Sequence, residues 1–559
     1  MDKVWRLKVK REKEKTLLES ILSSKGIVNP EDIKEFLSDK PQLTYDPFII
    51  KSMDKAVEKI KKHIEYGNKI VIFGDYDVDG IASTALLVEF IGILTNNIDY
   101  YIPNRFSEGY GLNKEAIRYI KKELEGQLII TVDNGVSSHD EVEYAKELGM
   151  DIIITDHHNP PDILPKCILI NTKQKDDNYP FKDLCGCGIA FKLIQALQRE
   201  FNISRKYLNR ALDLVALATI ADLVPLLDEN RTITKYGLKS INANNRIGLL
   251  ALREELGLKD RYINAGTIGF TIAPCFNATG RIEDARLGVK LLLETDLTKA
   301  RIMGETLVKM NNTRKDIQEK GESHCMELAG KKYLNDDFLV LDGGNISEGV
   351  IGIIAGRIKD AFYKPTLVIT RGEEGYLKGS GRSISGINIY DEMKKVSDLL
   401  ISFGGHEMAC GFSIDEDRVK ELRERLNNQA KEIRKKDPEI FKPKVDIVTE
   451  ANVEELSIDI INSLSKLEPY GVGNPKPLFI LKNIEVNNNW TRACGSDNSH
   501  LKFSGKKNNI FVNGIGFSLA KKYYSLKSPN KVHLAFYTDI NEYKGEKRPQ
   551  LIIEDLSPA

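Results

Sequence analysis

The chain has 559 residues, of which 41% are hydrophobic and 29% are charged. This composition is typical of a folded soluble protein and excludes a disordered or membrane-spanning chain. Its 81 Lys and Arg balance 81 Asp and Glu, which excludes a uniformly basic nucleic-acid coat but not a locally basic groove. Seven Cys and a charged start without a secretory signal favour a reducing, cytoplasmic compartment.

The length predicts about three or four domains. Residues 1–50 are dense in charged side chains and predict an N-terminal helical region. From residue 51, short β-branched runs alternate with helical segments, a pattern typical of a parallel sheet covered by helices. The polar stretch from Thr295 to about Ala329 has no Pro and predicts a long connecting helix. We therefore expect a first α/β domain over residues 51–330, this helix included.

A smaller α/β domain is expected over residues 331–435, followed by a Lys- and Pro-rich linker. Over residues 445–559, short strand-like runs separated by turn residues predict a small β-barrel. Between Leu481 and Gln550 there are 12 Lys and Arg against 5 Asp and Glu, with 9 aromatic residues interleaved. Such a basic, aromatic barrel suits single-stranded nucleic acid, whereas a barrel core with a solvated Lys face is the alternative.

Acidic motifs follow three strands of the first domain at the point where each strand ends. They are Gly74-Asp-Tyr-Asp-Val-Asp-Gly80, Asp133 in Thr-Val-Asp-Asn-Gly, and Asp156-His-His158. Asp222 follows a later apolar helical run. Each motif alone could be a turn or a helix cap. Because ligands bind outside the carboxyl ends of the strands in an open parallel sheet, the three together predict a shared site.

The chemistry of these side chains indicates a divalent cation. Carboxylate oxygens with one or two imidazoles suit Mn²⁺ or Mg²⁺, whereas thiolates would suit zinc. Four carboxylates carry four negative charges, which two divalent cations would neutralise, and a pair of ions is the usual arrangement for phosphodiester hydrolysis. The four carboxylates are Asp77, Asp79, Asp133 and Asp222.

These motifs resemble those of the DHH phosphoesterase superfamily and, more narrowly, of RecJ-type single-strand-specific DNA exonucleases. The resemblance covers nearly the whole chain, and it implies a DHH domain, a smaller α/β DHH-associated domain joined by a long helix, and a C-terminal barrel of the oligonucleotide-binding (OB) type. The blocks that mark the narrower branch occur in order: Ile102–Gly111, Ala218–Pro225, Asn277–Arg281, Gly349–Ile353, Gly379–Ser383 and Gly404–Gly411.

The resemblance also implies roles for individual residues. It implies metal ligands at Asp77, Asp79, Asp133, His157 and Asp222, with Asp75 as a further candidate. It adds His158 and His406 to the catalytic set, with His406 at the scissile phosphate and a structural role as its alternative. Arg281, Ser380 and Arg382 would grip the 5′ phosphate, Arg105 would hold the strand, and Tyr110 would stack on a base or pack as a surface aromatic.

Two further features stand beside this resemblance. Many relatives carry a His shortly before the Gly349 block, where this chain has Ile346-Ser347-Glu348. The Cys185-Gly-Cys187-Gly motif has no second Cys pair at metal-binding spacing, so we expect these Cys to be buried small residues.

The expected function is a single-strand-specific 5′→3′ DNA exonuclease of DNA repair and recombination. It would release 5′-mononucleotides by two-metal hydrolysis with Mn²⁺ or Mg²⁺. The alternatives are a phosphodiesterase for cyclic dinucleotides or short oligoribonucleotides, which the basic barrel disfavours, and an inactive scaffold, which the intact acidic set disfavours. The expected partners are single-stranded DNA, a single-strand-binding protein and a helicase, for a monomer without a membrane contact.

Overall fold

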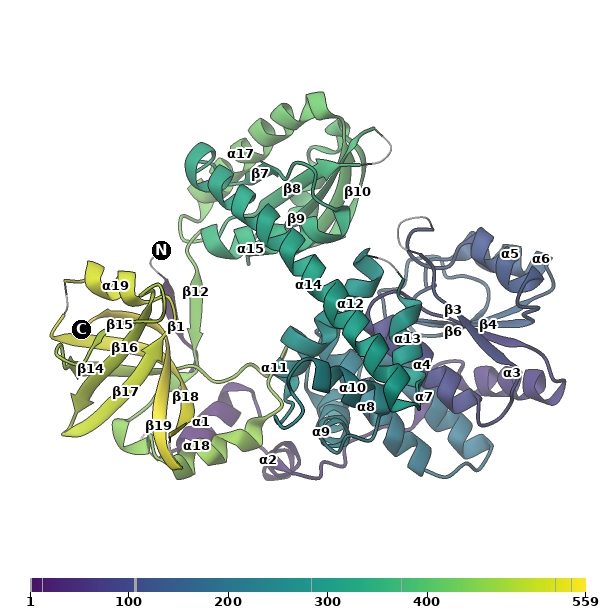
Figure 1. The fold of residues 1–559 in the computed structure, drawn as a ribbon, viewed down its shortest axis with the longest axis horizontal. Coiled ribbons are helices and arrows are strands. Elements are labelled where there is room, and N and C mark those ends of the chain that lie inside the picture. Colours follow the sequence, from purple (N-terminus) through teal and green to yellow (C-terminus); the bar gives the residue numbers. More distant parts are fainter. Residues whose placement is uncertain are drawn as a thin grey trace. The chain divides into compact units, whose positions relative to one another are not determined.

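The structure, a computed structural model, describes residues 3–12, 14–104, 108–282, 284–372, 375–527, 529–543 and 545–559. The chain forms two compact units (Figure 1). The larger unit comprises Leu43–Phe441 with Gly471–Gly473, and the smaller comprises Met1–Gln42, Lys442–Tyr470 and Asn474–Ala559. Among the helices of the described residues, none is both long enough and apolar enough to cross a membrane.

The larger unit begins with a five-stranded parallel sheet of order β3-β2-β4-β5-β6. Alternate residues of β2 enter two different cores, as expected for strands covered on both faces. The strand order places the carboxyl ends of β2, β4 and β5 side by side. The strands are β2 (Ile70–Phe73), β3 (Ile98–Tyr101), β4 (Leu128–Val132), β5 (Asp151–Thr155) and β6 (Ile168–Ile170), and the helices among them are α3 (Met53–Glu65), α4 (Val78–Ile91), α5 (Lys114–Lys122) and α6 (His139–Glu147).

A helical part follows and ends in one long helix, α14 (Leu297–Glu327), as the sequence predicts. Asp296 starts this helix by accepting hydrogen bonds from the backbone N–H groups of Thr298 and Lys299. The preceding elements are α7 (Gly186–Glu200), α8 (Lys206–Ala221), α9 (Asp228–Asn242), α10 (Ile247–Glu255), α11 (Ala265–Thr267), a π-helical turn (Ile268–Ile272), α12 (Ala273–Ile282) and α13 (Arg286–Leu293).

The long helix joins two cores of the larger unit (Figure 1). Its first half packs against helices α10, α12 and α13 and enters the core of the first α/β part through Ala300 and Leu307. Its last turns pack through Cys325 onto a second, mixed sheet of order β10-β11-β9-β8-β7. That part contains β7 (Leu339–Asp342), α15 (Glu348–Phe362), β8 (Thr366–Arg371), β9 (Leu377–Arg382), α16 (Ile389–Lys394), β10 (Leu400–His406), β11 (Ala409–Ile414) and α17 (Val419–Lys436).

The smaller unit contains a barrel, which confirms the predicted OB-type fold. Five strands follow one another in the order β14-β18-β19-β17-β16, and an additional β14–β16 pairing closes them. The unit contains β12 (Lys444–Ile447), β13 (Thr449–Glu450), α18 (Ile458–Leu464), β14 (Phe479–Val486), β15 (Arg492–Cys494), β16 (His500–Lys507), β17 (Ile510–Gly516), α19 (Ala520–Ser525), β18 (Lys531–Tyr543) and β19 (Glu546–Pro558).

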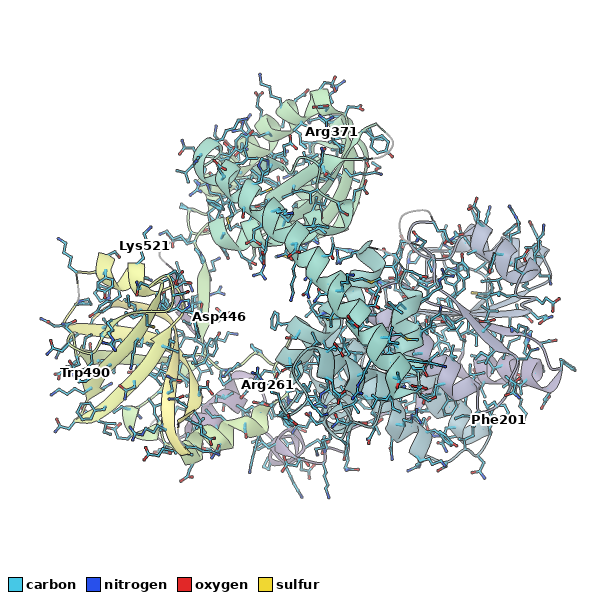
Figure 2. All side chains as sticks on the ribbon, in the orientation of Figure 1. Phe201, Arg261, Arg371, Asp446, Trp490 and Lys521 are labelled. Carbon is cyan, nitrogen blue, oxygen red and sulfur yellow. The ribbon has the colours of Figure 1, made fainter. Side chains whose placement is uncertain are left out.

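The aromatic residues of this barrel divide into two groups. Phe503, Tyr523 and Phe536 are buried in its core. Trp490 and Phe511 are largely exposed, at 64% and 73% of their surface. Figure 2 shows Trp490 on the outside of this unit. The barrel therefore has both a packed aromatic core and aromatic side chains accessible from solvent.

The start of the chain differs from the helical region expected for residues 1–50. Helices α1 (Leu17–Ser24) and α2 (Pro30–Leu37) are present, but β1 (Val4–Leu7) precedes them and pairs in parallel with β12. The indole Nε1 of Trp5 donates to Asp555 Oδ2 at 2.8 Å. This pairing spans more than 400 residues of sequence, so local charge density, the basis of the helical expectation, cannot show it.

Candidate metal centre and substrate pocket

The turn after β2 brings carboxylates to the N-terminus of α4. Asp77 caps this helix, and its Oδ1 accepts the backbone N–H groups of Asp79 at 2.9 Å and Gly80 at 3.1 Å. Asp79 lies in the first helical turn. A Cβ at Gly80 would lie 2.5 Å from the backbone of Asp75, so glycine is required for this tight approach of the turn to the helix.

Asp79 is held by the N-terminus of α7. Its Oδ2 accepts the backbone N–H of Gly186 at 2.6 Å, and its Oδ1 accepts that of Cys187 at 2.7 Å. A Cβ at Gly186 would lie 2.6 Å from the Cβ of Asp133, so glycine also makes room for a second carboxylate. The expectation that Cys185 and Cys187 are buried is confirmed, but the amide donors beside them were not expected.

Three elements bring carboxylates around one imidazole. Asp133 follows β4 with φ of 63°, a left-handed conformation that Asp tolerates better than most residues. Its Oδ1 lies 3.1 Å from Nε2 of His157. The same nitrogen lies 3.7 Å from Oδ2 of Asp222, which ends α8, and 3.9 Å from Oδ2 of Asp79. One imidazole nitrogen is thus within 4 Å of three carboxylates.

Asp156 positions the neighbouring His158. Its Oδ1 accepts the backbone N–H groups of His157 at 2.7 Å and of His158 at 3.0 Å, and it lies 2.7 Å from His158 Nδ1. Its Oδ2 accepts the N–H of Val136 at 2.9 Å. Burial opposes ionisation of Asp156, but the hydrogen bonds and charge of His158 together with the N–H of Val136 outweigh it, so the pKa of this carboxyl is lowered. An ionised Asp156 makes Nδ1 the donor and turns Nε2 outward.

Crowding shifts the protonation of this cluster. Burial, with the charge of Asp77 second, raises the pKa of Asp79 to about 7. Burial, with Asp79 second, raises the pKa of Asp222 to about 8 and that of Asp133 well above its usual value. Burial, with the charge of His158 second, lowers the pKa of His157 to about 3. These ligands are thus a neutral imidazole and carboxylates that repel one another, and the set has no positive charge of its own to balance the carboxylates.

The cluster fits hard divalent cations. Oδ1 of Asp133 is buried and receives no hydrogen bond within the described part of the chain. Oxygen ligands with few imidazoles suit Mn²⁺ or Mg²⁺. Three sets of ligand atoms each lie within 4.8 Å of one another: Asp75, Asp77 and Asp133; Asp79, His157 and Asp222; and Asp133, His157 and His158.

The raised carboxyl pKa values predict how the metal-free protein responds to pH. A carboxyl whose pKa is higher in the folded than in the unfolded chain destabilises the fold as pH rises toward the folded value. Asp222 alone should therefore lower the free energy of unfolding in EDTA by about 2 kcal/mol between pH 6.5 and 8.5, and the raised pKa values of Asp79 and Asp133 should add to this fall. His157 works in the opposite direction only below pH 6.5. Denaturant titrations at the two pH values measure this, and Asp222→Asn should flatten the dependence; an unchanged slope in that variant would contradict the assignment.

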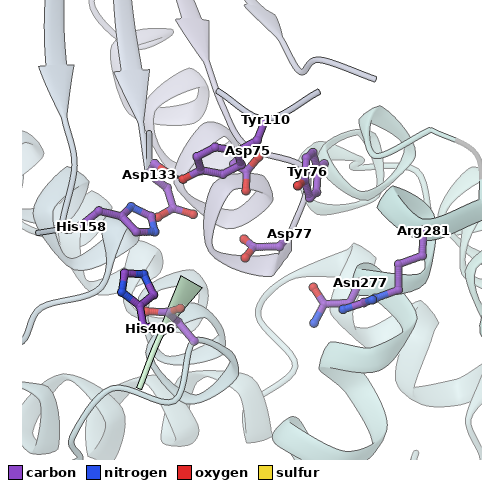
Figure 3. A pocket seen from close by; sticks show the side chains of 10 residues that line it. Asp75, Tyr76, Asp77, Tyr110, Asp133, His158, Asn277, Arg281 and His406 are labelled. Atoms are coloured by element: carbon purple, nitrogen blue, oxygen red, sulfur yellow. Dashed lines mark hydrogen bonds between the residues drawn. The ribbon is translucent and has the colours of Figure 1, made fainter. Parts of the chain in front are cut away.

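A cavity of about 400 Å³ opens in front of these carboxylates. In Figure 3, Asp75, Asp77 and Asp133 point into the same space. His406, from the end of β10 in the second α/β part, lines the same cavity. The side chains that line it are Asp75, Tyr76, Asp77, Tyr110, Asp133, His158, Asp222, Asn277, Arg281 and His406.

Asn277 is a lining residue whose role the sequence did not reveal, although it opens one of the motif blocks. Its Oδ1 accepts the backbone N–H of Val78 at 3.0 Å. Val78 is the first residue of α4, directly after Asp77. Asn277 therefore ties α12 to the turn that carries the carboxylates, and its position in the cavity wall is fixed by that bond.

Arg281, Ser380 and Arg382 lie around the first turns of α15. Arg281 Nη1 donates to the backbone carbonyl of Gly349, and Arg382 Nη1 donates to Ser380 Oγ at 3.1 Å. A Cβ at Gly352 would lie 2.8 Å from Arg382 Nη2 and 3.0 Å from Ser380 Oγ. The structure thus brings these three side chains together on one helix start, although they come from two α/β parts.

Tyr110 and Arg105 are the remaining substrate-binding residues expected from the sequence. Tyr110 is 56% exposed, its hydroxyl donates to the backbone carbonyl of Asp133 at 3.4 Å, and its ring stands edge-on to His158 with centroids 6.2 Å apart. A ring so placed is accessible at the cavity wall rather than packed away. Arg105 lies outside the described residues.

Comparison with known families agrees with this arrangement. The model of the DHH family, N-terminal domain, matches residues 69–219. The DHHA1 domain matches residues 335–432, and the RecJ OB domain matches residues 447–555. The three matches together cover the parallel sheet, the second sheet and the barrel.

Individual relatives are similar over almost the whole chain. The single-stranded-DNA-specific exonuclease RecJ of Bacillus subtilis is 37% identical over 543 residues, which are 97% of this chain and 68% of the relative. That of Escherichia coli is 34% identical over 569 residues, 97% of this chain and 96% of the relative.

Solved structures give the same result. The crystal structure of RecJ from Thermus thermophilus in complex with Mn²⁺ has a TM-score of 0.81 and 27% identity, covering 100% of this chain and 80% of that chain. The complex of RecJ from Thermus thermophilus with Mg²⁺ has a TM-score of 0.78 and 25% identity, covering 100% and 78%. With a relative 34% identical over 96% of its length and all three domain families present, this chain belongs to the RecJ family of single-stranded-DNA-specific exonucleases.

Proposed function

We propose that this protein is a metal-dependent phosphodiesterase that degrades single-stranded DNA from the 5′ end, releases 5′-mononucleotides and acts in DNA repair and recombination. One observation supports this above all others. Carboxylates from two strand ends, His158 after β5 and His406 meet at one cavity, whose wall also contains Arg281. A nuclease needs such a combination, because cations must bind beside a phosphate and a separate cationic group must hold the strand.

The metal ligands follow from the cluster. We assign two divalent cations, Mn²⁺ or Mg²⁺, to Asp77, Asp79, Asp133, His157 and Asp222, with Asp75 beside them. When bound, these ions would supply Lewis acidity at the scissile phosphate and lower the pKa of a water molecule. The RecJ of Thermus thermophilus has been solved in complex with Mn²⁺ and in complex with Mg²⁺. The amides of Gly186 and Cys187 would keep Asp79 oriented whether or not the site is loaded.

The chain's own residues would then bind and orient the strand. Arg281, Ser380 and Arg382 would hold the terminal 5′ phosphate through charge-assisted hydrogen bonds. His406 would donate to an oxygen of the scissile phosphate, and His158, oriented by Asp156, would face the same phosphate. Tyr110 would stack on a base, and Arg105 would contact the strand.

Substrate competition tests this proposal. The purified protein is incubated with a single strand, the same strand as a duplex, and a cyclic dinucleotide, with Mn²⁺ and with EDTA. We expect Mn²⁺-dependent hydrolysis of the single strand and little of the other two. Faster hydrolysis of the cyclic dinucleotide, or hydrolysis in EDTA, would contradict the proposal.

The barrel should strengthen binding of long strands. Deleting residues after 445 is a poor test, because β1 would lose its partner strand β12. Replacing the exposed Trp490 and Phe511 by Ala should instead weaken binding of a long single strand by about 1–3 kcal/mol for each lost base stack. Fluorescence anisotropy measures this, with the exposed Tyr66→Ala as control. Equal affinities of parent and double variant would show that the barrel aromatics do not contact DNA.

We further propose that the protein acts as a monomer in the cytoplasm. A single-strand-binding protein and a helicase are the partners that its substrate suggests, because a helicase generates single strands and a single-strand-binding protein covers them. Size-exclusion chromatography with light scattering, with and without DNA, tests the monomer.

A further inference from the structure

A second cavity, of about 370 Å³, lies beside the first and shares Asn277 and Arg281 with it. None of the roles assigned above uses the rest of its wall. That wall contains Arg314 and Lys315 of α14 and Arg357 of α15, and one carboxylate, Glu319. With Arg281 the lining therefore carries four cationic side chains against one acidic one.

Arg314 shows that this excess of positive charge is built into the fold. The residue is 8% exposed. Its Nε lies 3.0 Å from Asn311 Oδ1 and its Nη1 lies 2.9 Å from Gln318 Oε1, and both of these partners are neutral amides. Across the described ranges no carboxylate lies within ion-pair distance of this guanidinium. A buried cation without a counter-ion is costly unless an anion binds.

An exposed aromatic ring, that of Phe270, lies at the same cavity in an irregular turn of the helix. Phe270 is 89% exposed and lies in the π-helical turn Ile268–Ile272. Pro274 follows four residues later and has no N–H to give to the carbonyl of Phe270. The helix widens here, and the N–H of Ala273 bonds instead to the carbonyl of Ile268. Such π-turns interrupt helices at the cost of regular hydrogen bonding and are frequent at functional sites.

We propose that this cavity is a second nucleotide subsite, with Arg314, Lys315 and Arg357 binding a phosphate and Phe270 stacking on the base. The inference rests on the proposed nuclease function and extends it. The volume is sufficient for a small ligand. The nucleotide is either part of the bound strand or the free 5′-mononucleotide product, since both present the same phosphate and base.

Two variants test the subsite without touching the proposed catalytic residues. They are Phe270→Ala and Arg357→Ala, with the exposed Tyr66→Ala and Lys320→Ala as matched controls. Steady-state hydrolysis of a long single strand gives kcat and KM, and added dAMP gives an inhibition constant. If the parent is inactive, equilibrium binding of the strand and of dAMP in EDTA compares the variants with the parent instead.

The two sources of the nucleotide give different results, and either supports the subsite. If it belongs to the strand, Phe270→Ala should raise KM about 5- to 100-fold with little change in kcat, because one base stack is lost. Arg357→Ala should then reduce the slope of log KM against log salt by about 0.7, the effect of one phosphate contact. If it is the product, the inhibition constant for dAMP should rise instead while KM stays constant.

Parent-like values of KM, salt slope, dAMP inhibition and binding in both variants would overturn the subsite. This failure is distinct from failure of the proposed function. An inactive parent contradicts the nuclease proposal and leaves the binding comparison to decide on the subsite, whereas an active parent with unaffected variants contradicts the subsite alone.

Discussion

Asp133→Asn should reduce hydrolysis of single-stranded DNA by at least about 1000-fold, because a bound cation contributes several kcal/mol of transition-state stabilisation that a neutral amide cannot hold in place. Asp133 is the carboxylate that occurs in two of the three candidate ligand sets, and His157 is the imidazole that does. Asn is the right substitute because it tolerates the left-handed φ of 63° at this position. Ala would add backbone strain and mix two effects.

The same substitution should stabilise the metal-free protein. It removes one of several buried carboxylates that raise each other's pKa. Thermal unfolding in EDTA should therefore give a higher Tm for the variant, and added Mn²⁺ should raise the Tm of the parent more than that of the variant. Asp162→Asn, in which a 95% exposed side chain changes, serves as the control. Parent-like activity in a folded Asp133→Asn would exclude Asp133 as a ligand.

Arg382→Ala should narrow the preference for 5′-phosphorylated over 5′-hydroxyl strands by about 10- to 100-fold, since each charge-assisted hydrogen bond to a phosphate contributes about 1.5–3 kcal/mol. Burial lowers the pKa of this guanidinium, and the structure pairs it with the neutral Ser380, so it remains available to an anion. A terminal phosphate carries more charge than an internal one, so this guanidinium stabilises its binding more strongly.

The quantity to measure is the ratio of cleavage rates on the two substrates. Arg371→Ala, an exposed arginine at the end of the neighbouring strand β8, should leave this ratio unchanged. Arg382→Lys should retain part of the preference, because the charge stays while the planar fork is lost. A lower rate on both substrates with an unchanged ratio in Arg382→Ala would mean that the 5′ end is recognised elsewhere.

Strand order explains why much of this site could be predicted from the sequence. A carboxylate that directly follows a buried parallel strand has to lie at the carboxyl edge of the sheet, so Asp133 and the motif after β2 had to converge. The fold class followed in the same way, from apolar runs alternating with helices. These are local patterns with a fixed geometric consequence.

The parts that could not be predicted depend on contacts between distant segments. The amides of Gly186 and Cys187 meet Asp79 only because α7 starts more than 100 residues later at the same edge, and no side chain signals a backbone donor. The role of Asn277 could not be predicted for the same reason, because its partner is the backbone N–H of Val78. The pairing of β1 with β12 joins two segments of the smaller unit that are far apart in the sequence, and nothing in the charged first residues indicates it.

The first product released from end-labelled DNA tests the central claim most directly. A single strand labelled at the 5′ phosphate and the same strand labelled at the 3′ end are digested with Mn²⁺, and products are resolved at early times. We expect the 5′ label to appear at once as a labelled mononucleotide, while the 3′ label stays on progressively shorter strands. Early release of a 3′-labelled mononucleotide, or of internal fragments from both substrates, would contradict it.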